Sequence, residues 1–165
     1  MLHLILRAIP APVHRRLYRI ADWLRRRWWS IRKPRRHSVS VVAFDGDGRV
    51  LLVRHSYGPP VWALPGGGID RGEQPIAAAA REFAEELRCP LADVRSLRET
   101  TQDESGALDR LNVFVAQVAG TPVPDMREIV AAGFFDPAGL PRPADRRVAG
   151  WVAEAVALRA GERRS

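Results

Sequence analysis

The chain has 165 residues, with 26 Lys and Arg against 19 Asp and Glu, and 46% of its residues are apolar. This length suits one domain of ordinary size with a short appendage, and the apolar content allows a buried core, which excludes a fully disordered chain. A single cysteine, Cys89, excludes an intramolecular disulfide framework and a zinc site built from several cysteines. No run approaches ~18 consecutive apolar residues, so we expect no bilayer-spanning helix.

The net charge of +7 is distributed unevenly. Residues 1–36 hold 11 Lys and Arg and one acidic residue, Asp22, whereas residues 37–165 hold 15 basic and 18 acidic side chains. The basic character therefore belongs to a separate segment. We divide the chain into a basic amphipathic N-terminal segment with a linker, residues 1–36, and a mildly acidic globular domain, residues 37–165.

Residues 13–31 carry the pattern of an amphipathic helix. Apolar residues recur there at spacings of three and four: Val13, Leu17, Ile20, Ala21, Leu24, Trp28 and Ile31. A basic helix that bears tryptophan suits peripheral contact with an anionic membrane surface. The alternatives are packing of this apolar stripe on the following domain or on a second copy in a homodimer, and, less favoured, contact with nucleic acid. Residues 32–36 combine Pro34 with like charges, which predicts a linker.

The globular part reads as a mixture of strands and helices. The apolar runs 39–44 and 50–55 flank the turn Asp45-Gly46-Asp47-Gly48, which predicts a hairpin. Further strands are expected at 94–101, 111–118 and 128–135, with a polar loop over 102–110. Helical periodicity covers 75–87, with Pro75 in the first turn, and 145–160.

The helix predicted at 75–87 carries three glutamates on one side. Glu85 and Glu86 lie three and four residues beyond Glu82. Like charges at this spacing cost a few tenths of a kcal/mol each unless they are neutralised. Arg81 can pair with Glu85, but one arginine cannot neutralise three carboxylates. A hard dication such as Mg²⁺ can, because it takes carboxylate and carbonyl oxygens.

These glutamates belong to a longer pattern with fixed spacing. Gly67 is followed by five residues, Glu73, seven residues, and then Arg81-Glu82-Phe83-Ala84-Glu85-Glu86-Leu87-Arg88-Cys89. The string resembles the Nudix box of Nudix hydrolases, G-x5-E-x7-R-E-U-x-E-E-x-G-U, where U is a bulky apolar residue. The preceding Trp62-Ala63-Leu64-Pro65-Gly66-Gly67 also resembles the lead-in often seen in that family. Arg88 replaces the box glycine, where a left-handed conformation costs another residue roughly 1 kcal/mol.

The resemblance implies a fold, a reaction and a set of site residues. The fold is the Nudix α/β/α sandwich with a mixed sheet, over about residues 38–160. The reaction is hydrolysis of a diphosphate linkage in a nucleoside diphosphate joined to another moiety, with Mg²⁺ or Mn²⁺ as cofactor. The implied metal ligands are Glu82, Glu85, Glu86 and the carbonyl of Gly66. The implied catalytic residues are Glu82, Arg81 and Glu85, with Glu82 as ligand or general base and Arg81 orienting the glutamates.

Substrate contacts are expected around the glycine-rich loop, where glycine lets the backbone approach phosphate closely. The candidates are Gly67, Gly68, Arg54 and Trp62. His55 shares the strand end with Arg54 and is a weaker candidate for phosphate contact. Glu128 is a weaker candidate for a further metal ligand. Weaker candidates for an additional base are Asp103, Glu104 and Asp109.

Two other functions remain open on the sequence alone. One is a non-catalytic Nudix-fold module that binds nucleotides or regulates, although the glutamates that such a module could lose are present. The other is an RNA 5′-end pyrophosphohydrolase, for which the basic segment would contact phosphates. We expect a cytoplasmic protein, with the basic helix as the element that could reach the inner membrane surface.

Overall fold

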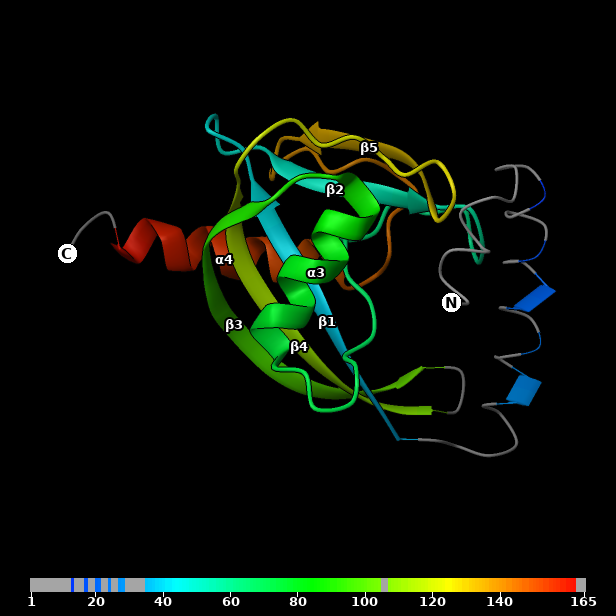
Figure 1. Ribbon diagram of the computed structural model, residues 1–165. Coiled ribbons are helices and arrows are strands. Elements are labelled where there is room, and N and C mark those ends of the chain that lie inside the picture. Colours follow the sequence, from blue (N-terminus) through cyan, green and yellow to red (C-terminus); the bar gives the residue numbers. More distant parts are fainter. Residues whose placement is uncertain are drawn as a thin grey trace.

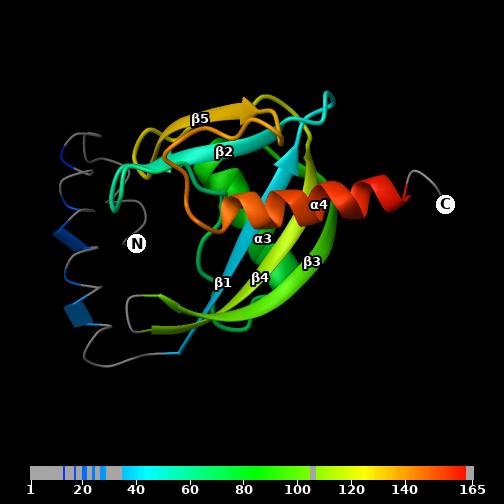
Figure 2. The ribbon, with the colours of Figure 1, turned by 180° about the vertical axis from the view of Figure 1, so that it is seen from behind.

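A computed structural model describes residues 35–104 and 107–162, together with Val13, Leu17, Ile20, Ala21, Leu24, Arg27 and Trp28. Five strands form one sheet in the order β3-β4-β1-β2-β5. β1 and β4 run parallel, and the other neighbouring strands run antiparallel. Helix α3 covers one face of the sheet and α4 the other (Figures 1 and 2). The predicted α/β/α sandwich with a mixed sheet is therefore confirmed. In chain order the elements are β1 (Arg35–Phe44), β2 (Val50–His55), α3 (Pro75–Leu87), β3 (Leu91–Glu104), β4 (Ala107–Val118), β5 (Ile129–Phe135) and α4 (Val148–Glu162).

Alternate residues of the central strands fill the two faces of the sheet. In β1, Val39 and Val41 pack in the core on the α3 side, while Val42 and Phe44 pack in the core on the α4 side. Successive side chains of a strand point to opposite faces, so a strand buried on both faces reads as a continuous apolar run. The helices close the two cores with Ala78, Ala79, Phe83 and Leu87 from α3 and with Val148, Val152 and Ala155 from α4.

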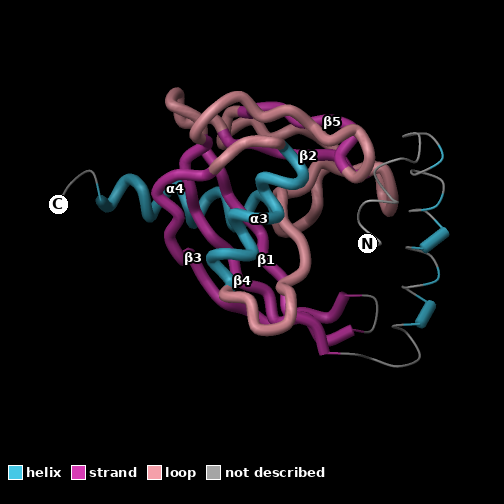
Figure 3. The backbone as a smooth tube through the Cα atoms, in the orientation of Figure 1, coloured by secondary structure: helices cyan, strands magenta, loops and turns pink. Residues whose placement is uncertain are grey.

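The connection between β2 and α3 fills a gap in the sheet. β1 and β2 pair where β1 ends and β2 begins, and they separate further along. In the gap the N–H of Val39 donates to the carbonyl of Gly67 at 2.9 Å, and Val53 and Ala63 exchange two backbone hydrogen bonds of 2.9 Å. Strand backbone on both sides therefore holds the glycine loop, residues 65–68, just before the chain enters α3 (Figure 3).

Helix α3 begins and ends where the sequence predicts. Pro75 occupies its first turn, where a missing N–H is harmless. Arg88 ends it in a left-handed conformation (φ 52°, ψ 32°), with its N–H donating to the carbonyl of Ala84 at 2.9 Å. This is the conformation predicted at the position where the Nudix box carries glycine. Cys89 follows and is 2% exposed, as expected of a small buried residue.

The hairpin of β3 and β4 is longer than predicted. The predicted polar loop over 102–110 is wrong, because β3 continues to Glu104 and β4 begins at Ala107. Buried and exposed side chains alternate along this part of β4, and Arg110 pairs with Glu99 across the strands at 2.7 Å. Polar residues on the exposed side of a hairpin suit strands as well as loops, which is why composition alone misassigned them.

Further boundaries differ from the prediction, and β3 begins at Leu91 and not at residue 94. The predicted linker over 32–36 is wrong at its C-terminal end, because β1 begins at Arg35 and Arg36 lies opposite Asp109 of the extended β4. The remaining linker residues lie outside the described part of the chain. The C-terminal helix begins at Val148, later than the predicted start at residue 145.

The described residues of the N-terminal segment are helical. Val13, Leu17, Ile20, Leu24 and Trp28 expose between 49% and 57% of their surface. The rest of the helix predicted over residues 13–31 lies outside the described residues. Every helix of the described chain is too short or too polar to cross a lipid bilayer.

Candidate active site

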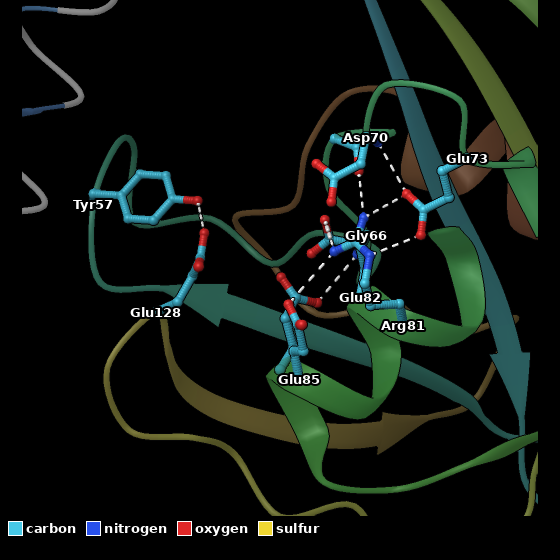
Figure 4. A network of polar contacts seen from close by, with 10 residues as sticks. Tyr57, Gly66, Asp70, Glu73, Arg81, Glu82, Glu85 and Glu128 are labelled. Carbon is cyan, nitrogen blue, oxygen red and sulfur yellow. Dashed lines mark hydrogen bonds and ion pairs between the residues drawn. The ribbon is translucent and has the colours of Figure 1, made fainter. Parts of the chain in front are cut away.

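The three glutamates of α3 lie close together but in different environments. The side chains of Glu82 and Glu85 are 18% and 58% exposed, and Figure 4 shows both beside Arg81. Glu86 is only 4% exposed. Its Oε2 accepts a hydrogen bond from the N–H of Gly66 at 3.2 Å. The helix therefore carries one buried carboxylate against the glycine loop and two that reach toward solvent.

Arg81 joins the glycine loop to the helix. Its guanidinium donates to both oxygens of Glu73, at 2.8 and 2.9 Å, and to the carbonyl of Gly68 at 2.9 Å. It also donates to Glu82 at 2.9 Å and more weakly to Glu85 at 3.5 Å. The planar fork of arginine suits such multiple contacts. The pair between Arg81 and Glu85 that the spacing suggests is therefore the longest of these contacts.

Two glycines allow the loop to approach this helix. A Cβ on Gly67 would lie 2.4 Å from Cδ of Glu82. A Cβ on Gly66, whose φ is +148°, would lie 2.2 Å from the carbonyl oxygen of Val39. A real Cβ cannot occupy either position without moving its neighbours. The glycine pair of the predicted motif is thus required for the loop to fit between β1 and α3.

A second set of side chains meets Glu86 from β2 and the start of β5. His55, Glu86 and Glu128 each offer one potential ligand atom, and these atoms lie within 4.8 Å of one another. The hydroxyl of Tyr57 donates to Oε1 of Glu128 (Figure 4). The N–H of Ser56 donates to the backbone carbonyl of Glu128 at 2.8 Å. Residues that are more than 70 positions apart are therefore fixed against each other.

Burial and mutual repulsion disfavour the charged form of these carboxylates. Burial, reinforced by the charge of Glu128, raises the pKa of Glu86 well above its ordinary value. Burial also raises the pKa of Glu82, although its ion pair with Arg81 opposes the shift. A cluster of this kind is stable at neutral pH only with bound protons or a compensating cation.

The donor chemistry of this cluster fits a divalent metal ion. Glu86 and Glu128 supply carboxylate oxygens, which Mg²⁺ and Mn²⁺ accept, and His55 supplies an imidazole nitrogen. The charge of Glu82 also acts on Glu86. Arg81 contacts Glu82 and Glu85, whereas Glu86 is buried among further carboxylates. The residues present therefore match a cation site in both charge and ligand type.

The glutamates open into a cavity of about 530 Å³. This volume lies in the range of sites for small molecules and cofactors, ~300–1,000 Å³. Glu82, Glu85 and Glu128 line it together with the three glycines of the loop. The wall on the α4 side presents Arg147, whose guanidinium lies 5.6 Å from the ring of Trp151. The cavity thus joins an acidic region to a region with a cation and an aromatic ring.

Two of the predicted substrate contacts lie outside this cavity. The guanidinium of Arg54 lies over the ring of Trp62, 5.9 Å from its centroid. Trp62 packs edge-on against Phe135 at 4.8 Å, within the core on the α4 side. The substrate contacts of Arg54 and Trp62 stay predictions, and neither residue is part of this cavity's lining. Gly67 and Gly68 do line the cavity.

The three candidates for an additional base also differ in position. Asp109 is 3% exposed, lies at the cavity, and accepts a hydrogen bond of 2.6 Å from the hydroxyl of Ser38. Asp103 is exposed on β3, and the side chain of Glu104 lies outside the described part. Arg147 and Trp151 were not predicted at the site, because the helical period of this segment shows only which residues can share a helix face.

The charge pair between Glu73 and Arg81 generates a prediction about pH. Hydrogen bonds from Arg81 lower the pKa of Glu73 to about 2. A carboxylate with a lowered folded-state pKa stabilises the fold above its unfolded pKa of ~4.3, and this stabilisation is lost as the pH falls toward 2. We therefore expect Glu73→Gln to lower the melting temperature at pH 7, and the difference from wild type to shrink between about pH 5 and pH 2.

Thermal unfolding followed by circular dichroism across this pH range checks the prediction. Asp47→Asn is the matched control, because the Asp47 side chain is 79% exposed in the turn between β1 and β2. A difference for Glu73→Gln that stays constant with pH would show that the charge of Glu73 is not what stabilises the loop.

Comparison with known proteins agrees with this geometry. A sequence model of the NUDIX domain matches residues 34–155. The crystal structure of a MutT NUDIX hydrolase from Burkholderia pseudomallei superposes with a TM-score of 0.66 and 26% identity, covering 73% of this chain and 97% of that one.

Two relatives named RNA pyrophosphohydrolase match a shorter region. The one from Dinoroseobacter shibae is 43% identical over 68 residues, which is 41% of this chain and 42% of the relative. The one from Caulobacter vibrioides is 53% identical over 53 residues, 31% of either chain. The chain thus matches less than half the length of these curated relatives. Because the NUDIX domain match covers most of the chain, and the fold agrees, the chain belongs to the Nudix hydrolase family.

Proposed function

We propose that this protein catalyses metal-dependent hydrolysis of a diphosphate linkage in a nucleoside diphosphate joined to another moiety. The observation that carries the proposal is that Glu82 and Glu128, from two distant parts of the chain, line one cavity, and that the buried Glu86 lies within 4.8 Å of Glu128 beside it. A dication bound there would neutralise the diphosphate oxygens and make a water molecule a better nucleophile.

In this proposal the residues of α3 have different chemical roles. Glu85 and Glu86, with the carbonyl of Gly66, would hold the dication, and Glu128 would be a further ligand from the start of β5. Glu82 acts either as a further ligand or as the base that accepts the proton of the attacking water. Arg81 acts as a positioning residue, because its contacts with Glu73 and the carbonyl of Gly68 join the loop to the helix.

The outer part of the cavity supports a nucleotide-sized substrate. Arg147 is held by Asp145, whose Oδ1 accepts from its Nε at 2.9 Å, and by the side-chain oxygen of Gln102. The fixed guanidinium and the ring of Trp151 offer a polar edge and an aromatic face. The glycine loop between them and the glutamates presents backbone to the phosphates.

An RNA 5′ end is the second candidate substrate. The names of the relatives from Dinoroseobacter shibae and Caulobacter vibrioides favour it. The net charge of residues 1–36, with 11 basic residues and one acidic residue, suits contact with a phosphate backbone. A nucleotide-binding module without turnover is the third possibility, and it predicts binding without hydrolysis.

Release of phosphate or nucleotide from a panel of substrates tests the proposal. The panel contains nucleoside triphosphates, ADP-ribose, nucleotide sugars, dinucleoside polyphosphates and 5′-triphosphorylated RNA, with Mg²⁺ or Mn²⁺. We expect turnover that needs the metal and that Glu86→Gln lowers by at least about 100-fold, the loss typical when a group that stabilises developing charge is removed.

Glu99→Gln is the matched control, because Glu99 pairs with Arg110 on the exposed side of the hairpin, away from the cavity. Its activity should stay within about two-fold of wild type. Equal turnover by wild type and Glu86→Gln would contradict the proposed site. Nucleotide binding without turnover on any substrate would favour the module.

We further propose that the N-terminal helix contacts an anionic membrane surface. Val13, Leu17, Ile20, Leu24 and Trp28 are helical and about half exposed. At 100° per residue they fall within an arc of about 80° on one side of the helix. The surrounding sequence is strongly basic, which complements anionic lipid and not a neutral protein surface. The protein would then act in the cytoplasm at the inner membrane surface.

Sedimentation with vesicles tests this contact. Full-length protein should bind vesicles of phosphatidylglycerol and phosphatidylcholine in equal parts, and Leu24→Glu should weaken binding by at least about 10-fold, since a buried leucine contributes ~1.5–3 kcal/mol. Leu108→Glu is the matched control, because Leu108 is 48% exposed in the domain. Equal binding by all three proteins, or self-association in place of vesicle binding, would contradict the proposal.

A further inference from the structure

His55 lies at the end of β2 on the face of the sheet that α3 covers. Leu51 and Val53 of the same strand pack in the core on the α3 side. The ligand atom of His55 lies within 4.8 Å of that of Glu86 on α3, so His55 points to that side, whereas Arg54 lies over Trp62, which packs against the core on the α4 side. The two neighbouring residues, which the sequence offered together as phosphate contacts, therefore face different parts of the molecule.

The pairing of β2 with β5 brings Glu128 beside His55. The register of the two strands shifts between Arg54 and His55, so that His55 lies opposite Ile129. The next N–H, from Ser56, donates to the carbonyl of Glu128 at 2.8 Å. Irregular pairing of this kind changes the direction of side chains at the end of a strand, and such irregularities often lie next to active sites.

Glu86 completes the group from α3. The ligand atoms of His55, Glu86 and Glu128 lie within 4.8 Å of one another. Two hydrogen bonds hold the carboxylates. The N–H of Gly66 donates to Glu86 at 3.2 Å, and the hydroxyl of Tyr57 donates to Glu128. Atoms that bind one ion at ~2.0–2.2 Å lie at most about 4.4 Å apart, so these three side chains would move closer together when an ion binds.

We propose that His55 is a nitrogen ligand of the dication held by Glu86 and Glu128, and that the site therefore binds Mn²⁺ in preference to Mg²⁺. Mg²⁺ strongly prefers oxygen ligands and is reluctant to lose its water. Imidazole nitrogen favours first-row transition metals, and their affinity rises from Mn²⁺ toward the later members of the series. The inference rests on the proposed function only in requiring that a dication binds here.

Metal binding to the full chain, without nucleotide, tests the inference independently of hydrolysis. Mn²⁺ and Mg²⁺ are titrated separately by calorimetry into wild type and His55→Asn, which replaces the imidazole with an amide. We expect wild type to bind Mn²⁺ at least about 10-fold more tightly than Mg²⁺, and His55→Asn to lose at least about 10-fold of its Mn²⁺ affinity while changing little toward Mg²⁺. His37→Asn is the matched control, because His37 is exposed on β1.

A spectroscopic measurement makes the result independent of how well the variant folds. Pulsed paramagnetic resonance of Mn²⁺ bound to wild type should show coupling to a nitrogen nucleus, and this coupling should be absent in His55→Asn and present in His37→Asn. A bound Mn²⁺ without nitrogen coupling in wild type would overturn the inference and leave the proposed hydrolysis intact. Failure of wild type to bind either metal would overturn both.

Discussion

The buried carboxylate of Glu86 is the feature on which the rest of the site depends. It is 4% exposed, accepts the N–H of Gly66, and lies near Glu128 and Glu82, so its charged form is disfavoured by burial and by repulsion. Such an arrangement costs stability unless something compensates the charge. The hydrogen bonds from Gly66 to Glu86 and from Tyr57 to Glu128 hold these carboxylates close together, in an arrangement whose charge matches a cation site.

The fold holds the carboxylates together by placing an irregular segment, the glycine loop of residues 65–68, inside a regular sheet. The separation of β1 from β2 leaves backbone groups that the glycine loop satisfies, for example through the bond from Val39 to Gly67. Glycine at positions 66 and 67 removes the side chains that would collide with Val39 and Glu82. Arg81 then joins the loop to the helix through Glu73 and Gly68, which fixes the position of the loop against the glutamates.

Sequence reasoning predicted those parts of the protein whose signals are local. The bounds of α3 and the two strands of the first hairpin follow from periodicity, proline and turn residues, and the left-handed Arg88 follows from its place at the glycine of the resembled box. The extension of β3 and β4 over residues 102–110 was not predicted, because polar residues on the exposed side of a hairpin have the composition of a loop. The meeting of His55, Glu86 and Glu128 depends on the pairing of β2 with β5, and nothing in the local sequence of either strand specifies that pairing. Arg54 and Trp62 lie near the motif in sequence, yet Trp62 packs against the core on the α4 side and Arg54 lies over its ring.

Thermal unfolding of wild type and Glu86→Gln, each with and without Mn²⁺, tests most directly whether the carboxylate cluster is built for a cation. Without metal, Glu86→Gln should melt at a higher temperature than wild type, because it removes a buried charge from among like charges while keeping the shape of the side chain. Added Mn²⁺ should raise the melting temperature of wild type, since a ligand that binds only the folded state stabilises it, and should have little effect on the variant. A variant that is less stable than wild type without metal, or that keeps the full shift with Mn²⁺, would contradict this account.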